Sequence, residues 1–206
     1  YWNTTGQYNT AIGRDALSSN TTASQNTAVG YQALLTNSTG YNNVAVGLHS
    51  LYGNTTGTFC IAIGVNAAKS STTAVQNTVI GYKALESNTS GSYNTVVGYE
   101  AAKSGTTGGY NTVFGREALY TNTTGNFNVA IGQSTLLLNT TAGYNVGVGY
   151  QAIRANTTGE DHVAMGYQAL FSNTTGQSNT ALGRTALYTN TTGGSNVAVG
   201  RDALKD

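Results

Sequence analysis

Hydrophobic and polar residues alternate in one short phrase that returns along the whole chain. The phrase is Asn-Thr-Ala-Ile-Gly at 9–13, Asn-Thr-Ala-Val-Gly at 26–30 and Asn-Val-Ala-Val-Gly at 196–200. Its three central residues are β-branched or small, and they stand between an asparagine and a glycine. A short alternating run bounded by turn-forming residues predicts a β-strand.

The phrase recurs with a fixed period. Its closing glycine falls every 17 residues from Gly13 to Gly200 without insertion or deletion, which gives twelve repeats. A fixed short period is the signature of a solenoid. Seventeen residues are too few for a helix pair, leucine is too sparse for leucine-rich repeats, and aspartate is too scarce for calcium-binding nonapeptide repeats. We therefore predict an all-β fold, a single β-solenoid over residues 1–206 with twelve 17-residue coils and a length of about 58 Å at about 4.8 Å per coil.

The same pattern predicts which side chains fill each coil, if the asparagine at residue 9 is taken as position 1 of the repeat. Position 2 is Thr, Val or Ile and position 4 is a sizeable apolar residue, so we place both inside the coil. The residue at position 9, mostly leucine, would meet them from a strand on the opposite wall. Each coil would then bury only about two large side chains, which is little for an isolated rod.

Position 3 would point outward under this assignment, and it holds small apolar residues in every repeat. Such a column favours close packing of a second chain in a homo-oligomer, most simply a trimer. A monomer with an unused alanine stripe is the alternative. The predicted lateral interface consists of Ala11, Ala28, Ala45, Ala62, Val79, Val96, Val113, Ala130, Ala164, Ala181 and Ala198.

Asparagine marks both corners of the repeat, at position 1 and at position 12, where a turn of the type Asn-Thr-Thr-Gly begins. Asparagine side chains bond to nearby backbone and tolerate left-handed geometry. In a solenoid each asparagine would lie above the one in the coil below, so we predict a hydrogen-bonded ladder. Where position 12 is Ser71 or Gly105, position 9 is Ala68 or Ala102, which indicates that the two positions shape one corner together.

The turn at position 12 also spells the acceptor motif for N-linked glycans, Asn-x-Ser/Thr. A glycan is therefore the alternative use of these asparagines, and O-linked sugar on the paired threonines, such as Thr4 and Thr5, is another. The candidate N-glycosylation residues are Asn3, Asn20, Asn37, Asn54, Asn88, Asn122, Asn139, Asn156, Asn173 and Asn190.

Composition narrows the classes of function. The formal net charge is +1 and the nine lysines and arginines are scattered singly, so no basic stripe for nucleic acid is present. Fourteen tyrosines and the low net charge argue against disorder. No apolar run approaches the ~18 residues that a membrane span needs. The single cysteine, Cys60, excludes an intrachain disulfide.

Catalytic and metal chemistry is not indicated by any grouping of residues. His162 follows Glu160 and Asp161 but occupies an asparagine position, and no second histidine column faces it. No serine or cysteine has a base beside it. We expect no enzyme activity, no metal and no cofactor.

Tyrosines form two columns, one after the motif glycine, as at Tyr82 and Tyr99, and one before the strand, as at Tyr93 and Tyr110. Aromatic packing between coils is one interpretation, and binding of sugar rings along the rod is the other.

The phrase at 128–132 and 196–200 resembles the head repeats of trimeric autotransporter adhesins. It is still more similar to the NTAIGYQAL-type repeats of predicted phage tail fibres and other long surface proteins. The resemblance covers all twelve repeats, although adhesin heads usually have shorter coils. It implies a left-handed parallel β-roll, three chains around one axis, and display outside the cell.

These observations predict a structural protein, an extracellular fibre or filament rod that belongs to a phage fibre or a bacterial surface appendage. The alternative is an adhesin head that binds surface glycans through its tyrosine and threonine columns. Ice binding is a third hypothesis, but it would need a flat Thr-x-Thr face, whereas adjacent threonines at a turn separate their hydroxyls. Because the first and last coils look like the middle ones, we expect a segment of a longer fibre or a subunit that stacks end to end through Trp2, Lys205 and Asp206.

Overall fold

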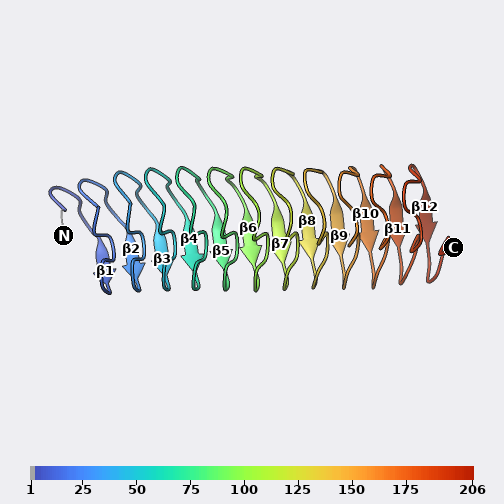
Figure 1. The fold of residues 1–206 in the computed structure, drawn as a ribbon, viewed down its shortest axis with the longest axis horizontal. Coiled ribbons are helices and arrows are strands. Elements are labelled where there is room, and N and C mark those ends of the chain that lie inside the picture. The colour runs from blue at the N-terminus through green and yellow to red at the C-terminus, as the bar shows by residue number, and fades with distance from the viewer. Residues whose placement is uncertain (1–2) are drawn as a thin grey trace.

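The computed structural model describes residues 3–206, which coil into a rod with one short strand per coil (Figure 1). Each strand pairs in parallel with the next, so one twelve-stranded sheet runs in the order β1 to β12. The strands are β1 (Thr10–Ile12), β2 (Thr27–Val29), β3 (Val44–Val46), β4 (Ile61–Ile63), β5 (Thr78–Ile80), β6 (Thr95–Val97), β7 (Thr112–Phe114), β8 (Val129–Ile131), β9 (Val146–Val148), β10 (Val163–Met165), β11 (Thr180–Leu182) and β12 (Val197–Val199).

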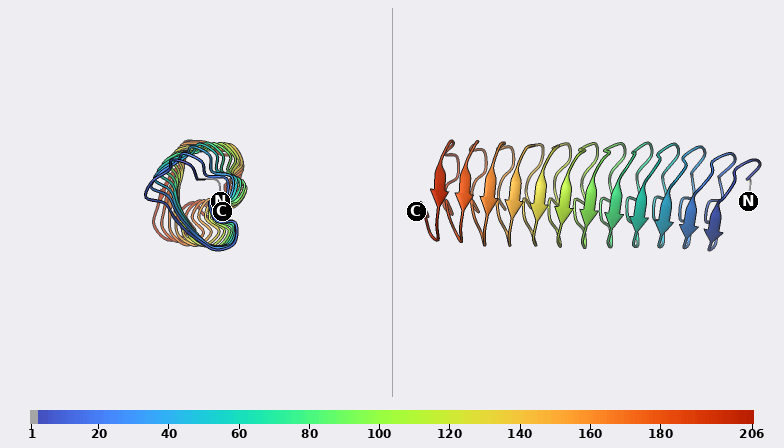
Figure 2. Two further views of the ribbon diagram at one scale, coloured as in Figure 1. Left: turned by 90° about the vertical axis from the view of Figure 1, so that its left-hand side faces the viewer. Right: turned by 180° about the vertical axis from the view of Figure 1, so that it is seen from behind.

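Register follows the sequence period in every pairing. Thr10 lies opposite Thr27, and the same offset of 17 residues continues to Thr180 opposite Val197. The view along the rod shows the coils superimposed with only a gradual drift (Figure 2). The predicted all-β solenoid with a 17-residue coil is confirmed.

The wall opposite the sheet is not the predicted strand. It is a run of turns in which positions 7 and 9 have left-handed backbone, as in Gln32 (φ 54°) and Leu34 (φ 51°). The Leu34 amide donates to the carbonyl of Ser50 in the next coil, and the Gln32 amide donates to the carbonyl of Arg14 in the previous one. Left-handed backbone costs roughly 1–2 kcal/mol per non-glycine residue. We infer that hydrogen bonds to both neighbouring coils offset that cost.

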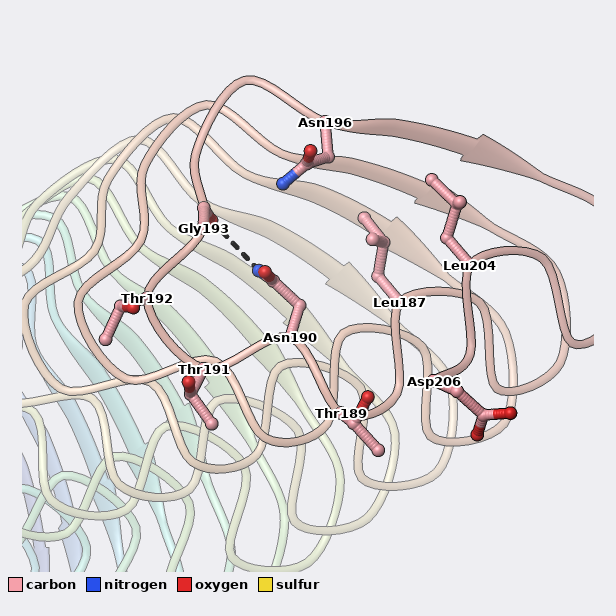
Figure 3. Close-up of a pocket in the computed structure, with 9 residues that line it drawn as sticks. All are labelled: Leu187, Thr189, Asn190, Thr191, Thr192, Gly193, Asn196, Leu204 and Asp206. Atoms are coloured by element: carbon pink, nitrogen blue, oxygen red, sulfur yellow. Dashed lines mark hydrogen bonds between the residues drawn. The ribbon is translucent and has the colours of Figure 1, made fainter.

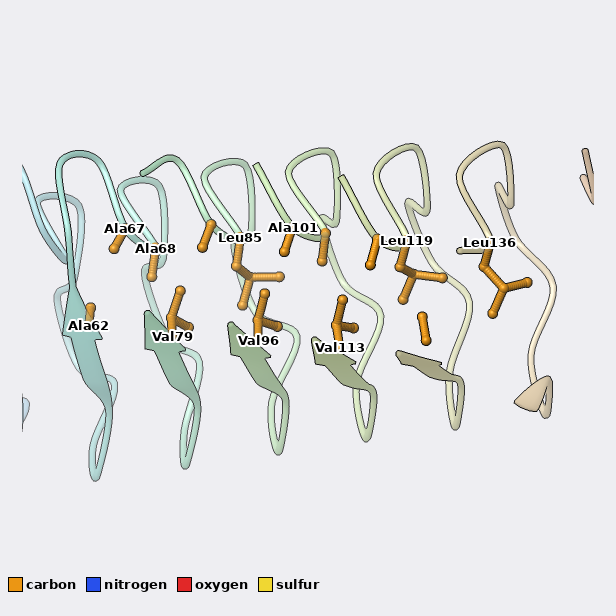
Figure 4. Close-up of a cluster of buried hydrophobic side chains, with 14 of the residues drawn as sticks. Ala62, Ala67, Ala68, Val79, Leu85, Val96, Ala101, Val113, Leu119 and Leu136 are labelled. Atoms are coloured by element: carbon orange, nitrogen blue, oxygen red, sulfur yellow. The ribbon is translucent and has the colours of Figure 1, made fainter. Parts of the chain in front are cut away.

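The core contains the side chains that were predicted to point outward. In β2, Ala28 is fully buried, whereas Thr27 and Val29 on either side of it face away from the coil. Position 3 meets the residue at position 9 from the opposite wall, as Val96 and Leu85 do in Figure 4. Positions 3, 8 and 9 therefore form the core, and positions 2 and 4 form an outer face.

The predicted lateral interface is therefore wrong. Ala11 lines the open end of the first coil with Asn9 and Leu17. The other members are at most 2% exposed inside the rod and cannot contact another chain: Ala28, Ala45, Ala62, Val79, Val96, Val113, Ala130, Ala164, Ala181 and Ala198.

Position 3 faces inward because the interior of each coil has room only for a small side chain on the strand. Position 8 carries Thr135 in place of the usual alanine, and the next coil carries Gly147 at position 3. A Cβ atom at residue 147 would lie only 2.7 Å from Cγ2 of Thr135. Conversely, position 9 is alanine in place of leucine at Ala68 and Ala102, and the coil that follows each of them carries the larger Val79 or Val113 at position 3. Volume is conserved from rung to rung because the core is close-packed.

Candidate interaction surfaces

The position-12 asparagines form a buried ladder along the rod. Nδ2 of Asn156 donates to Oδ1 of Asn139 at 2.9 Å and to the carbonyl of Gly159 at 2.8 Å. Nδ2 of Asn173 donates in turn to Oδ1 of Asn156 at 3.0 Å. Each side chain thus closes its own turn and binds the neighbouring coil. The predicted ladder is confirmed.

Two rungs of this ladder are missing, where position 12 is Ser71 or Gly105. Oδ1 of Asn54, Oγ of Ser71 and Oδ1 of Asn88 are buried there and have no hydrogen-bond partner. Asn88 keeps only the bond from its Nδ2 to the carbonyl of Gly91, at 3.0 Å. A buried polar atom without a partner costs about 1–3 kcal/mol, so this is the weakest part of the ladder.

Position 1 forms a second ladder. Oδ1 of Asn26 accepts from the backbone amide of Asn43 at 3.0 Å, and Nδ2 of Asn26 donates to the carbonyl of Gly40 at 2.9 Å. His162 replaces one asparagine of this column. Its Nδ1 accepts from the backbone amide of Asn179 at 3.2 Å, and burial lowers the pKa of the imidazole.

Cys60 replaces another asparagine of the position-1 ladder. Its Sγ lies 3.4 Å from the carbonyl of Ala74, and burial raises the pKa of the thiol. Both replacements therefore act as parts of the ladder, which is the role that their sequence positions indicated.

The N-glycosylation hypothesis is wrong for the asparagines inside the rod, because their side-chain amides are buried and bonded within the ladder. These residues are Asn20, Asn37, Asn54, Asn88, Asn122, Asn139, Asn156 and Asn173, all at most 2% exposed. Near the two ends, Asn3 is exposed and Asn190 is half-buried, but their Nδ2 atoms donate to the carbonyls of Gly6 and Gly193 at 2.9 Å.

The paired threonines of the turn separate into two roles. At position 13 the hydroxyl bonds to the next coil, as Oγ1 of Thr157 does to the carbonyl of Thr174 at 3.0 Å. At position 14 the side chain is exposed, as in Thr158 and Thr175. The two hydroxyl columns therefore do not form one flat hydroxyl-bearing face.

The aromatic columns stack face to face. Tyr93, Tyr110, Phe127 and Tyr144 form one continuous stack with ring centroids 4.7–5.2 Å apart and interplanar angles of 11–14°. Packing between coils is confirmed for this column. Because each inner ring has neighbours on both faces, it presents only its edge to solvent.

The second aromatic column combines stacked rings with cations. Tyr82 stacks on Tyr99 at 5.2 Å, and the guanidinium of Arg116 lies 5.7 Å from the centre of the Tyr99 ring. Tyr167 has Tyr150 on one face and Arg184 on the other. The ring faces that a sugar would need are again covered from within the chain.

Positions 2 and 4 of all twelve strands form a continuous outer surface, which we call the strand face. Position 4 is apolar in every coil, and position 2 is Thr, Val or Ile. Ile80 and Ile131 are each 38% exposed, and Met165 is 46% exposed. The position-6 column, which includes Tyr99, borders this face. No charged residue occurs at positions 2 and 4.

The hollow drawn in Figure 3 is the open end of the last coil. Its lining includes Leu187 and Leu204 from position 9 and Asn190 from position 12. Equivalent residues line a hollow at the first coil. These hollows are cross-sections of the rod interior. The predicted end contact falls partly on Trp2, outside the described residues, while Lys205 and Asp206 are exposed.

Titratable groups are scattered along the rod. Within residues 3–206, no three of His, Cys, Asp and Glu come together in a way that could hold a metal ion. Nζ of Lys103 lies 2.8 Å from Oε1 of Glu100, and this contact raises the pKa of the lysine.

No helix within residues 3–206 is long and apolar enough to cross a membrane.

Comparisons with protein-family models, with curated proteins and with solved structures found no match. The functional interpretation therefore depends on the geometry of this chain and on the resemblance of its repeats.

Proposed function

We propose that this chain is a structural rod, a segment of an extracellular fibre or filament in a phage fibre or a bacterial surface appendage. The observation that carries the proposal is the uniform offset of 17 residues across all eleven strand pairings. A stack of equivalent coils gives reach and stiffness from one short sequence motif. The location outside the cell rests on the resemblance to adhesin-head and fibre repeats.

Modular stacking has a direct test in chain length. Deletion of residues 111–127 removes one whole repeat and keeps the register of the remaining coils. We expect a folded rod, shorter by about 4.8 Å in small-angle scattering. The matched control deletes residues 111–126, which shifts every downstream side chain by one position, and we expect this variant to lose its cooperative unfolding transition.

The biological role is tested by electron microscopy of the source cells or particles with a gold-labelled antibody against this chain. The proposal expects label along thin projections on the outer surface. Label confined to the interior of the cell would overturn it.

No feature of the rod favours the adhesin-head alternative over the structural role. The inner tyrosines offer edges in place of ring faces, and the position-13 threonine hydroxyls are bonded to the next coil. We therefore propose no glycan partner.

A further inference from the structure

The strand face is the one large regular apolar surface of the described rod, and we propose that it packs face to face against the strand face of a second copy of this chain. The proposal deepens the structural role and rests on it, since paired rods would be thicker fibre elements. The contact replaces the alanine-column interface that burial rules out.

The composition of the face fits burial. Antiparallel sheets commonly leave one side in water by alternating apolar residues inward with polar residues outward. Here the alternation is reversed, because the small Ala130 lies inside while Val129 and Ile131 lie outside. Six of the twelve position-2 residues are threonine, whose hydroxyls can pair across an interface. An outer sheet surface of this kind is typical of a contact between proteins.

The size of the face matches a stable interface. Eleven strand spacings of about 4.8 Å give a length of about 53 Å, and three residues give a width of about 10 Å, so the strands alone cover about 500 Å². The bordering position-6 column, with exposed Tyr82, Tyr99 and Tyr150, widens the surface toward the ~800 Å² that each partner buries in a standard interface.

Periodicity identifies the partner. The face repeats one row of side chains at every strand spacing along its whole length, and a partner must carry the same spacing to fit all of the rows. A second copy has that spacing by construction, whereas an irregular surface would match only a few rows. Two sheets pack in this way about 10 Å apart in β-sandwiches.

Electrostatics permits the contact. The strand face itself carries no charge, and three of the four arginines in the bordering position-6 column, Arg14, Arg116 and Arg201, are paired with the acidic residue that follows each of them. The fourth, Arg184, lies over the ring of Tyr167. Arg116 lies 3.1 Å from Glu117, and Arg201 lies 3.2 Å from Asp202. Two copies can therefore approach with only one cation of this border column, Arg184, lacking an acidic partner in each chain.

The test is the oligomeric state of the full chain, measured by sedimentation velocity and light scattering over micromolar concentrations. We expect a dimer. The double variant Ile80→Lys/Ile131→Lys places two charges in the middle of the face, and we expect it to weaken the pairing by at least about 100-fold. Both side chains point outward, so far-UV circular dichroism should show an intact rod.

The matched control is Leu138→Lys. Leu138 is 39% exposed, close to the 38% of Ile80 and Ile131, but it lies on the wall opposite the sheet. The control variant should dimerise like the parent. A monomeric parent, or a multimer that the double variant leaves intact, would overturn the pairing. The proposed fibre role is separable from it, because a monomeric rod can still be labelled on the outer surface of the source.

Discussion

The loss of stability on replacing a position-12 asparagine should increase with the number of hydrogen bonds that its side chain makes in the ladder. Asn88, Asn122 and Asn156 provide a matched series, since each is followed three residues later by a glycine whose carbonyl accepts from its Nδ2. Asn88 has only that bond. Asn122 also accepts from Asn139, and Asn156 both donates to Asn139 and accepts from Asn173.

The magnitudes follow from these counts. A hydrogen bond contributes about 1 kcal/mol net, and the loss of side-chain packing on substitution by alanine is common to all three sites. We therefore expect Asn88→Ala, Asn122→Ala and Asn156→Ala to differ in steps of about 1 kcal/mol. The loss of stability for Asn88→Ala should be smaller still, because the substitution also removes an Oδ1 atom that is buried without a partner.

The assay is guanidinium denaturation followed by far-UV circular dichroism. Repeat rods can unfold in segments, so the curves should be fitted with a nearest-neighbour model, and amide hydrogen exchange should locate the loss at the substituted coil. Equal costs at the three sites would refute the idea that the ladder stabilises the stack. A larger loss of stability for Asn88→Ala than for Asn156→Ala would contradict the predicted order of the three sites.

Three further predictions concern the backbone and one buried base. Gly98 has φ 145°, and a Cβ there would lie 2.4 Å from the carbonyl oxygen of Gly115, so Gly98→Ala should lower the free energy of unfolding by about 3 kcal/mol or more in denaturant titration. Gln76 is exposed with φ 55°, so Gln76→Gly should stabilise by about 0.5–1 kcal/mol, whereas Gln76→Val at the same site should destabilise. Burial lowers the pKa of His162 below the ordinary histidine value of about 6.5, so the unfolded chain binds the proton first and the melting temperature should fall as pH drops below about 6.5. The variant His162→Asn should flatten that dependence, and an unchanged pH profile would contradict the burial argument.

The period of the sequence was sufficient to predict the architecture. The offset of Gly13 to Gly30 sets the strand register, and the polar corners predicted ladders that Asn139 and Asn156 form. These features are local and recur in almost every repeat, so each prediction rests on many copies of the same pattern. Sequence alone therefore predicted the stack and the asparagine contacts.

The direction of the strand side chains could not be predicted from size. The rule that large apolar residues lie inside failed, because the bore is filled by leucine from the opposite wall and by asparagine amides, which leaves room only for Ala28 or Val79 on the strand. The left-handed residues at positions 7 and 9 were also missed, since leucine gives no signal for that backbone. The pairing of Thr135 with Gly147 carries the signal that could have revealed the inward column.

A rod made of identical rungs has no preferred place to fail, but this rod has one. Ser71 and Gly105 replace two asparagines of the ladder, so consecutive coils in this short segment lack its side-chain hydrogen bonds, and the neighbouring side-chain oxygens are left unpaired. Under tension or heating, we expect that segment to part before the rest. Mechanical damage would then break the rod between Asn54 and Asn122, because the ladder is continuous on either side of that segment.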